Sequence, residues 1–342
     1  MKKLLVLVLC LICAASAFAG ASKEKASSDD APVLVVYATD SFLSEWGPAP
    51  VVFPKFEEKY GIKIDQRQGG SAGEIVNLAI MEKGKTGADI IIGVDNNLLS
   101  TVLKNDLFIT YKPAGIKNVK DELIFDKSYH VIPYDYSFFS LVYDSNRIKN
   151  PPKSLDDLLD PKYKKSLIVM DPRTSSPGLG FLMWTIKCKG DGYREYWKKL
   201  MPNVLTVSSS WSSGYGLFTS GEAPMVTSYT TSPAYHVEYD KDEHIKTVLF
   251  KEGNYMQTEG VGILKNAPHM DAAKKFLDFV LSEDFQNELA LTNWMYPVIE
   301  TKLPDSYKSA PVSDRPLLLS AEEIDKNLDS WLNGWLESTM AK

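Results

Sequence analysis

The sequence predicts an α/β protein built from two lobes, and three observations indicate this. Short apolar runs alternate with helix-like segments, which is the pattern of sheets covered by helices. A proline-rich boundary near residue 150 separates two such series. The chain has 342 residues, and the roughly 320 that follow an expected export signal suffice for about two domains.

The first series begins with a buried-strand candidate at 33–38. We expect a helix at 54–61, a strand at 62–65, a helix at 74–84 and a third strand at 88–94. This order predicts a largely parallel sheet with helices on both faces. Ligands of such sheets bind beyond the carboxyl ends of the strands, where this chain has small polar residues.

The second series begins with a strand at 138–148 that leaves the first lobe. The proline boundary and a new helix follow at 150–159. Strands are then expected at 166–172 and 224–229, and a helix start lies between them at Ser176, before a proline. The second lobe is therefore expected to alternate strands and helices, as the first does.

Two helices are expected late in the chain. One covers 271–289. The other begins at Ser320, which forms a capping-box pattern with Glu323. Its apolar side chains recur at helical spacing and predict a core face that includes Trp331 and Trp335.

The N-terminal segment is typical of a cleaved export signal. Two lysines precede an apolar run, and a small-residue cleavage motif ends at Ala19, before Gly20. We expect a signal peptide at 1–19, a mobile polar tether at 20–31 and a mature protein in the periplasm. A bulky residue before Cys13 argues against a lipid anchor, and no later segment is apolar enough to cross a bilayer.

Charge and cysteine content narrow the function further. Loss of the two signal-peptide lysines takes the formal net charge from −6 to −8, which favours solubility and argues against nucleic-acid binding. Cys188 is then the one cysteine of the mature chain. No internal disulfide can form, so we expect the fold to be stabilised by its core.

Sequence motifs for catalysis and for metal binding are absent. The four histidines are scattered, with no H-x-x-x-H, C-x-x-C or G-x-S-x-G pattern. His236 and Ser232 could be a nucleophile pair, but a hydroxyl-rich turn beside an ordinary histidine is the better interpretation. The carboxylates lack metal-ligand spacing, and no adjacent tyrosines of an iron carrier occur. We expect no catalytic residue, no metal and no cofactor.

Aromatic residues that are expected on polar, glycine-bearing loops are the most informative functional signal. Core or rim packing explains any one of them alone. Together they suit stacking on a flat heteroaromatic ring, or holding a cation over a π face, at roughly 0.5–2 kcal/mol per contact. The set consists of Trp46, Trp211, Tyr215, Tyr229, Tyr235 and Trp294.

Seven segments of the chain carry a family resemblance: YATDSFLSEWGPAPVV, GVDNNLL, PYDYSFFSLVYD, DPRTSSPGLG, WSSGYGLF, SYTTSPAYH and NWMYPV. They resemble, collinearly from about residue 32 to 335, the segments of periplasmic thiamine-binding proteins. Those proteins are the soluble receptors of ABC importers for thiamine (vitamin B1) and its phosphates. The resemblance implies a type II periplasmic binding protein fold, with two α/β lobes, a hinge and a ligand cleft between the lobes. We expect lobe 1 at 32–137 and 258–310, and lobe 2 at 138–257 and 311–342.

The resemblance also implies site residues. Ring-contacting aromatics fall on Trp46, Trp211, Tyr235 and Trp294, while Tyr229 and Ser175 match positions that serve the phosphate or hydroxyethyl end of the ligand. In the first lobe the chain departs from the pattern. Thr39 replaces an aromatic residue, and Ser71 stands where an acid is expected.

Further candidates complete the predicted site. Asp40, Asp95 and Asp135 are candidates for offsetting the positive charge of the thiazolium ring, and Tyr215 is a secondary ligand candidate. The expected ligand is thiamine, thiamine monophosphate or thiamine diphosphate.

The expected function is therefore ligand capture in the periplasm and delivery to the permease of an ABC transporter in the inner membrane, by a monomer. Within the binding class, a polyamine, a phosphonate or a chelated metal is an alternative ligand. An exported hydrolase that uses the serine–histidine turn and a purely structural envelope protein are alternatives from other classes.

Overall fold

The computed structural model describes residues 32–68, 70–82 and 85–340. The expected signal peptide (1–19) and tether (20–31) lie outside these residues. Within them, one mixed sheet of 11 strands runs in the order β2-β1-β3-β9-β4-β7-β5-β6, with β8 and β10 paired to β4 and β11 to β9. The strands are β1 (Val33–Ala38), β2 (Lys63–Gln68), β3 (Ile90–Asp95), β4 (Ile132–Asp144), β5 (Leu167–Met170), β6 (Val204–Ser208), β7 (Met225–Tyr229), β8 (Ile245–Val248), β9 (Asn254–Ile263), β10 (Tyr296–Pro297) and β11 (Pro316–Leu317).

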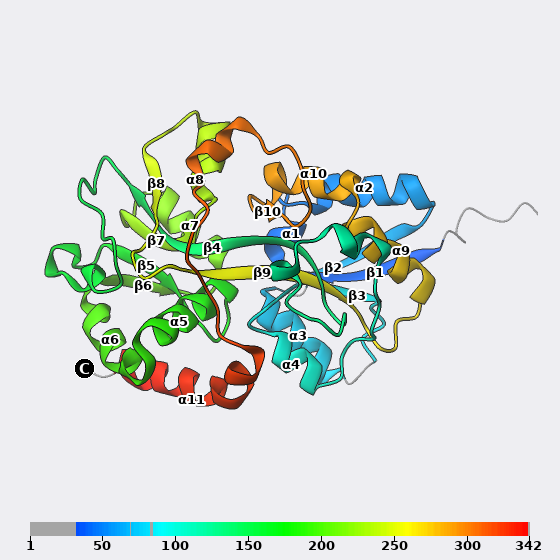
Figure 1. Ribbon diagram of the computed structural model, residues 1–342, viewed down its shortest axis with the longest axis horizontal. Helices are drawn as coiled ribbons and strands as arrows, with labels where there is room; N and C mark the ends of the chain where they lie inside the picture. The colour runs from blue at the N-terminus through cyan, green and yellow to red at the C-terminus, as the bar shows by residue number, and fades with distance from the viewer. Residues whose placement is uncertain (1–31, 69, 83–84, 341–342) are drawn as a thin grey trace, which may run out of the picture. The chain divides into compact units, whose positions relative to one another are not determined.

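The sheet has two parallel groups joined by two long antiparallel strands. β1 pairs in parallel with β2 and β3, and β5 pairs in parallel with β6 and β7. Between these groups, β9 is antiparallel to both β3 and β4, and β4 is antiparallel to β7. Figure 1 shows β4 and β9 passing side by side from one group to the other. The prediction of a largely parallel first sheet is confirmed for β1, β2 and β3, and the two strands that extend this sheet, β9 and β4, are antiparallel.

Helices cover both faces of the two groups, as Figure 1 shows. In the first group, α3 packs on β3, and α9 and α10 lie with α2 on the other side. In the second, α5, α6 and α11 lie on one side and α7 on the other. The helices are α1 (Asp40–Leu43), α2 (Ala49–Tyr60), α3 (Ala72–Met81), α4 (Leu99–Lys104), α5 (Ser176–Lys189), α6 (Tyr193–Leu200), α7 (Trp211–Thr219), α8 (Ser232–Tyr235), α9 (Met270–Val280), α10 (Glu283–Thr292) and α11 (Ala321–Met340). None of the helices in the described ranges is long and apolar enough to span a bilayer.

Two predicted helices are wrong. Residues 150–159 form only the short 3-10 turn Asp157–Leu159. There the Asp157 carboxylate accepts a hydrogen bond from the Lys153 amide (2.9 Å), and the Ser154 hydroxyl accepts one from the Asp157 amide (3.0 Å). Such local side-chain bonds compete with helix formation.

The helix expected at 271–289 is in fact two helices, α9 and α10. Ser282 separates them in an extended conformation (φ −87°, ψ 159°), and its hydroxyl donates to the Phe279 carbonyl (2.6 Å). The break lets both helices bury aromatic side chains in one core, where Phe279 and Phe285 meet edge to face at 5.7 Å between ring centroids.

The core role predicted for the last helix is confirmed. The Ser320 amide donates to the Glu323 carboxylate (2.9 Å), and the Glu323 amide donates to the Ser320 hydroxyl (3.2 Å), which completes the capping box. Trp335 is buried and meets the Trp197 ring edge to face at 5.9 Å, and Trp331 packs at the border of the same cluster. α11 thereby covers α6.

Candidate functional site

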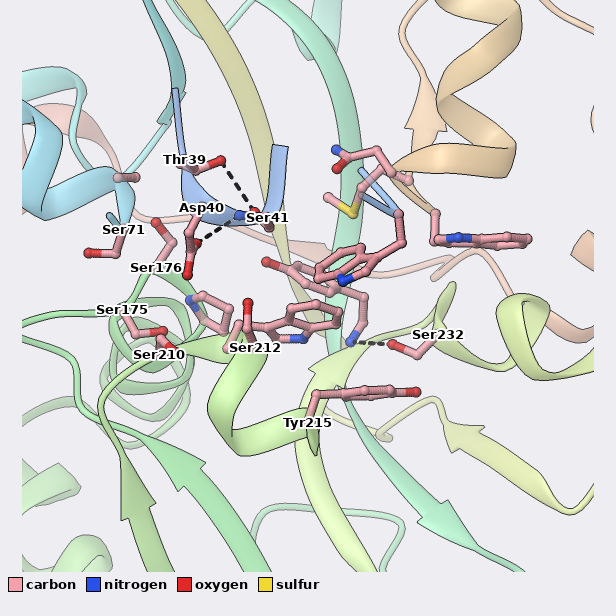
Figure 2. A pocket seen from close by; sticks show the side chains of 18 of the residues that line it. Thr39, Asp40, Ser41, Ser71, Ser175, Ser176, Ser210, Ser212, Tyr215 and Ser232 are labelled. Atoms are coloured by element: carbon pink, nitrogen blue, oxygen red, sulfur yellow. Dashed lines mark hydrogen bonds between the residues drawn. The ribbon is translucent and has the colours of Figure 1, made fainter. Parts of the chain in front are cut away.

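A pocket of about 290 Å³ lies where several strands and helices of the sheet begin or end. Its wall is made by the β1–α1 segment, the starts of α3, α5 and α7, the β7–α8 turn, β9 and the segment after α10. Figure 2 shows Asp40, Ser175, Ser176 and Ser210 on one side of this view and Tyr215 and Ser232 on the other. The lining is therefore assembled from parts of the chain that are far apart in sequence.

One aromatic wall of the pocket is centred on Trp211, the first residue of α7. Its indole stacks on Tyr215 at 5.0 Å with 21° between the planes, and it lies 5.8 Å from the Trp46 ring. The indole N–H donates to the Ser228 hydroxyl (2.9 Å). Trp46 is 45% exposed, so its ring offers free surface beside the pocket.

Tyr215 is itself anchored by a buried histidine. The Tyr215 hydroxyl lies 2.9 Å from His236 Nε2, and His236 Nδ1 lies 2.8 Å from an Asp240 carboxylate oxygen. His236 begins a π-helical turn, His236–Asp240. Both ring nitrogens of His236 are thus occupied, and the Ser232 hydroxyl instead lies 2.9 Å from that of Ser228. The histidine and this serine do not form a nucleophile pair, because each is bonded to another group.

A second aromatic wall is formed by Tyr235 and Trp294, whose rings meet edge to face at 5.5 Å. Trp294 also stacks on Tyr307 at 6.3 Å between centroids. Its backbone is left-handed (φ 54°), which is uncommon for a bulky residue and is held by a hydrogen bond from its amide to the Leu289 carbonyl (3.1 Å). Such conformations persist where the surrounding structure holds them, and they gather at ligand sites.

The start of α5 supplies hydroxyl groups to the pocket. Ser175 and Ser176 line it, and both side-chain oxygens are buried without a hydrogen-bond partner in the described residues. Gly178 lets this helix turn approach the end of β5, since a Cβ there would lie 2.6 Å from the backbone of Asp171. The helix N-terminus also presents free amides, so this side of the pocket favours anionic or hydroxyl oxygens.

Gly180 positions a third pocket tyrosine indirectly. A Cβ at Gly180 would lie 1.8 Å from the ring of Phe139, so only glycine allows α5 to pack against that ring. Phe139 in turn stacks on Tyr229 at 5.2 Å with 30° between planes. Burial raises the pKa of the Tyr229 hydroxyl, so it remains a neutral donor.

Besides Asp40, the pocket lining contains a second acidic residue, Glu259 on β9, which was not predicted from the sequence. Its carboxylate accepts hydrogen bonds from the Tyr134 hydroxyl (3.2 Å) and the Asn293 amide (3.4 Å). Burial, and next the charge of Asp95, raise the pKa of Glu259 to about 7. Glu259 is the one charged residue of the strand Asn254–Ile263, and that isolation is the signal that could have identified it.

The structure brings ten of the twelve residues predicted for the site into the pocket lining. These are Thr39, Asp40, Trp46, Ser71, Ser175, Trp211, Tyr215, Tyr229, Tyr235 and Trp294. Asp95 and Asp135 are fully buried and do not line the pocket. The lining also includes residues that were not predicted, among them Ser41, Ser176, Ser210, Ser212, Ser232, Glu259, Asn293 and Met295. Contact of any of these residues with a ligand stays a prediction.

The expectation that the aromatic residues lie on loops is only partly correct. Trp211 and Tyr215 lie on α7 and Tyr235 on α8, whereas Trp46 and Trp294 lie in connecting segments. Glycine disfavours helices, but Gly214 is needed in α7 because a Cβ there would lie 2.7 Å from the Met170 side chain and 3.2 Å from that of Ser208. No group of three or more His, Cys, Asp or Glu side chains in the described residues is arranged to hold a metal ion.

The ionisation of Glu259 makes a testable contribution to stability. A carboxyl group with a raised pKa binds its proton more tightly when folded, so the folded state loses stability as pH rises from 4.5 to about 7. Glu259→Gln should therefore become more stable relative to the wild type over that interval, and the difference should level off above it. Thermal unfolding of both proteins without ligand, measured between about pH 4.5 and pH 8, checks this. If the melting temperatures of wild type and Glu259→Gln changed equally with pH, the raised pKa of Glu259 would be contradicted.

Comparison with known families places residues 85–327 in the bacterial extracellular solute-binding proteins. The chain is 39% identical to a thiamine-binding periplasmic protein of Brucella abortus over 316 residues, which is 90% of this chain and 92% of the relative. It is 37% identical to the Escherichia coli thiamine-binding periplasmic protein over 330 residues, covering 96% of this chain and 97% of the relative.

Solved structures show the same similarity. A periplasmic thiamin binding protein superimposes with a TM-score of 0.88 at 36% identity, covering 92% of this chain and 98% of that one. An apo ferric ion-binding protein A from Pasteurella haemolytica has a TM-score of 0.76 at 18% identity over 90% of this chain and 98% of its own, a likeness of fold alone.

Proposed function

This chain belongs to the bacterial extracellular solute-binding proteins, and from that premise we propose that it is a periplasmic receptor that binds thiamine for an ABC importer. The fold is that of a type II periplasmic binding protein. Its relatives are binding proteins, and this chain is a binding protein rather than an enzyme. The relatives do not favour the alternative ligands or the hydrolase, since thiamine-binding periplasmic proteins are 39% and 37% identical over 90% and 96% of this chain.

One observation carries the choice of thiamine: aromatic rings from distant segments surround a pocket that also contains a carboxylate. Trp46, Trp211, Tyr235 and Trp294 supply flat faces, and Glu259 supplies negative charge. Thiamine combines two aromatic rings with a permanent positive charge on one of them. Stacking and cation–π attraction act on the same ligand in such a site.

The hydroxyl-rich side of the pocket supports binding of thiamine phosphates as well. The first residues of α3, α5 and α7 all line the pocket, and helix N-termini favour phosphate oxygens. Ser175 and Ser176 add hydroxyl groups that lack partners in the described residues. Asp40 lies on the same side in Figure 2 and opposes added negative charge. The three forms of thiamine should therefore be compared directly.

Delivery requires a protein that opens and closes. We propose lobe 1 at 32–137 and 258–310 and lobe 2 at 138–257 and 311–342, with β4 and β9 as the connection between them. Closure on the ligand would exclude water from the aromatic walls. The closed form of a monomer would then dock on the permease in the inner membrane, after removal of the signal peptide near Ala19. The acidic chain has no expected nucleic-acid partner.

Titration of the purified mature protein with thiamine tests the proposal. We expect saturable binding at micromolar ligand or below, with a change in tryptophan fluorescence and a heat signal, because Trp211 and Trp46 would contact the ring. Thiamine monophosphate and diphosphate should compete for the same site. Putrescine and 2-aminoethylphosphonate are the matched controls and should not compete. Absence of any response to thiamine at micromolar concentration would refute the proposed function.

A further inference from the structure

Three carboxylates lie in one row across three neighbouring strands. Glu259 on β9 pairs in register with Asp95 on β3 and with Asp135 on β4. Residues directly opposite each other on adjacent antiparallel strands face the same side, with their Cβ atoms about 4.5–5.5 Å apart. Among the three, Glu259 lines the pocket, while Asp95 and Asp135 are 0% exposed behind it. We call these three residues the carboxylate row.

Neutral hydrogen-bond donors surround the carboxylate row, and no basic side chain pairs with it. The Asn293 amide donates to Asp135 and Glu259, and the Gln257 amide donates to Asp95 (3.0 Å). Within the described residues, no lysine, arginine or histidine forms an ion pair with any member of the row. Within the described residues, one carboxylate oxygen of Asp135 is buried and has no hydrogen-bond partner. The row therefore lacks an internal counter-ion.

Three such carboxylates cannot all be charged at neutral pH without compensation. Burial raises the pKa of Asp95 to about 6. Burial and the charge of Glu259 raise the pKa of Asp135 well above its usual value. Like charges at this spacing share protons rather than ionise together. In the free protein, the row therefore holds at least one proton near neutral pH.

The titratable groups that face the row come from several elements. Beside the three members of the row, they are Tyr134 on β4, Tyr229 on β7, Tyr255 on β9 and Tyr307 in the 3-10 turn Asp305–Ser309. Burial raises the pKa of each tyrosine, so these hydroxyls stay neutral. The proton of the row thus resides on a carboxyl group.

We propose that the carboxylate row is the counter-charge that selects a cationic ring in this pocket, and that entry of the cation displaces a proton from the row to solvent. This inference rests on the proposed function and extends it. One positive charge enters as one carboxylic acid becomes a carboxylate and releases H⁺, so the net charge of the site is unchanged. A permanent cation such as thiazolium needs no hydrogen bond from the row, since its attraction is electrostatic.

The test compares thiamine with 3-deazathiamine, an isostere in which an uncharged thiophene ring replaces the thiazolium. Calorimetric titrations near pH 7, in buffers of different ionisation enthalpy, measure the protons released on binding. We expect wild type to release a proton with thiamine but not with 3-deazathiamine. It should also prefer thiamine by about tenfold or more, a modest figure for a buried charge pair.

Variants separate this role from a structural one. In Glu259→Gln the preference for thiamine and the proton release should both disappear, while the affinity for 3-deazathiamine is retained and shows that the pocket is intact. Asp135→Asn should also reduce the preference for thiamine and the number of protons released. Glu322→Gln, an exposed residue of α11, is the matched control and should leave both unchanged.

Two results would overturn the inference: no proton release by wild type, or an equal loss of affinity for both ligands in Glu259→Gln. If the proposed function were wrong, the result would differ from both of these, because wild type would bind neither thiamine nor 3-deazathiamine.

Discussion

Replacement of Trp211 by alanine should weaken thiamine binding by about 1–3 kcal/mol, which is roughly a 5- to 150-fold rise in Kd. The indole is held in place before any ligand arrives, by the stack on Tyr215 and by the hydrogen bond to Ser228. A ring that is already ordered loses little side-chain entropy on binding, so most of its contact energy contributes to affinity. Fluorescence or calorimetric titration of the variant measures the change.

Trp331→Ala provides the matched control for this variant. Trp331 lies on α11, borders the core and does not line the pocket. Its removal should leave thiamine affinity within about twofold, since the pocket is untouched. Equal affinities of wild type and Trp211→Ala would remove Trp211 from the binding site, whatever the control shows.

Replacement of Trp197 by alanine should lower the free energy of unfolding by about 3–5 kcal/mol, the range for truncation of a buried aromatic residue. Trp197 is 0% exposed and joins three helices. From α6 it meets Phe181 of α5 at 5.3 Å and Trp335 of α11 at 5.9 Å. Its N–H donates to the Thr185 hydroxyl (3.0 Å), which alanine would leave without that donor. Denaturant unfolding of the ligand-free protein measures the loss.

Two further variants serve as controls for the cost of Trp197→Ala. Trp197→Phe retains most of the apolar volume and should cost clearly less than alanine. Leu205→Ala, at a site 36% exposed on β6, should change stability by no more than about 0.5 kcal/mol. A cost for Trp197→Ala as small as that of Leu205→Ala would mean that the interface between α6 and α11 contributes little to the fold.

Local patterns in the sequence predict much of the fold. The strand VLVVYA is β1 as expected, and the helix start at Ser176 and the capping box of α11 are also found. These features depend on neighbouring residues, whose periodicity and capping chemistry act locally. The failures at 150–159 and 271–289 have one cause in common. In both segments, short side chains bond to the nearby backbone and interrupt a continuous helix.

The site also contains residues that the sequence predicts and residues that only the structure reveals. Its aromatic residues are recognisable because tryptophan and tyrosine in polar segments are unusual, and ten predicted residues share the pocket. Glu259 was not predicted because it lies in a buried strand whose sequence carries no recognised ligand-binding motif. Asp95 and Asp135 were named as acids near the ligand, yet they lie behind the wall. Both pair in register with Glu259, and Asp135 also accepts a hydrogen bond from Asn293 of the lining.

By itself, the sequence determined the α/β class, the presence of a single cysteine after residue 19 and the aromatic character of the site. Composition and local periodicity suffice for these properties, because each depends on residue types and near neighbours. The tertiary structure alone decided which acids act together. Asp95, Asp135 and Glu259 form a row only because β3, β9 and β4 pair in one register, and strand register depends on contacts between residues far apart in the chain.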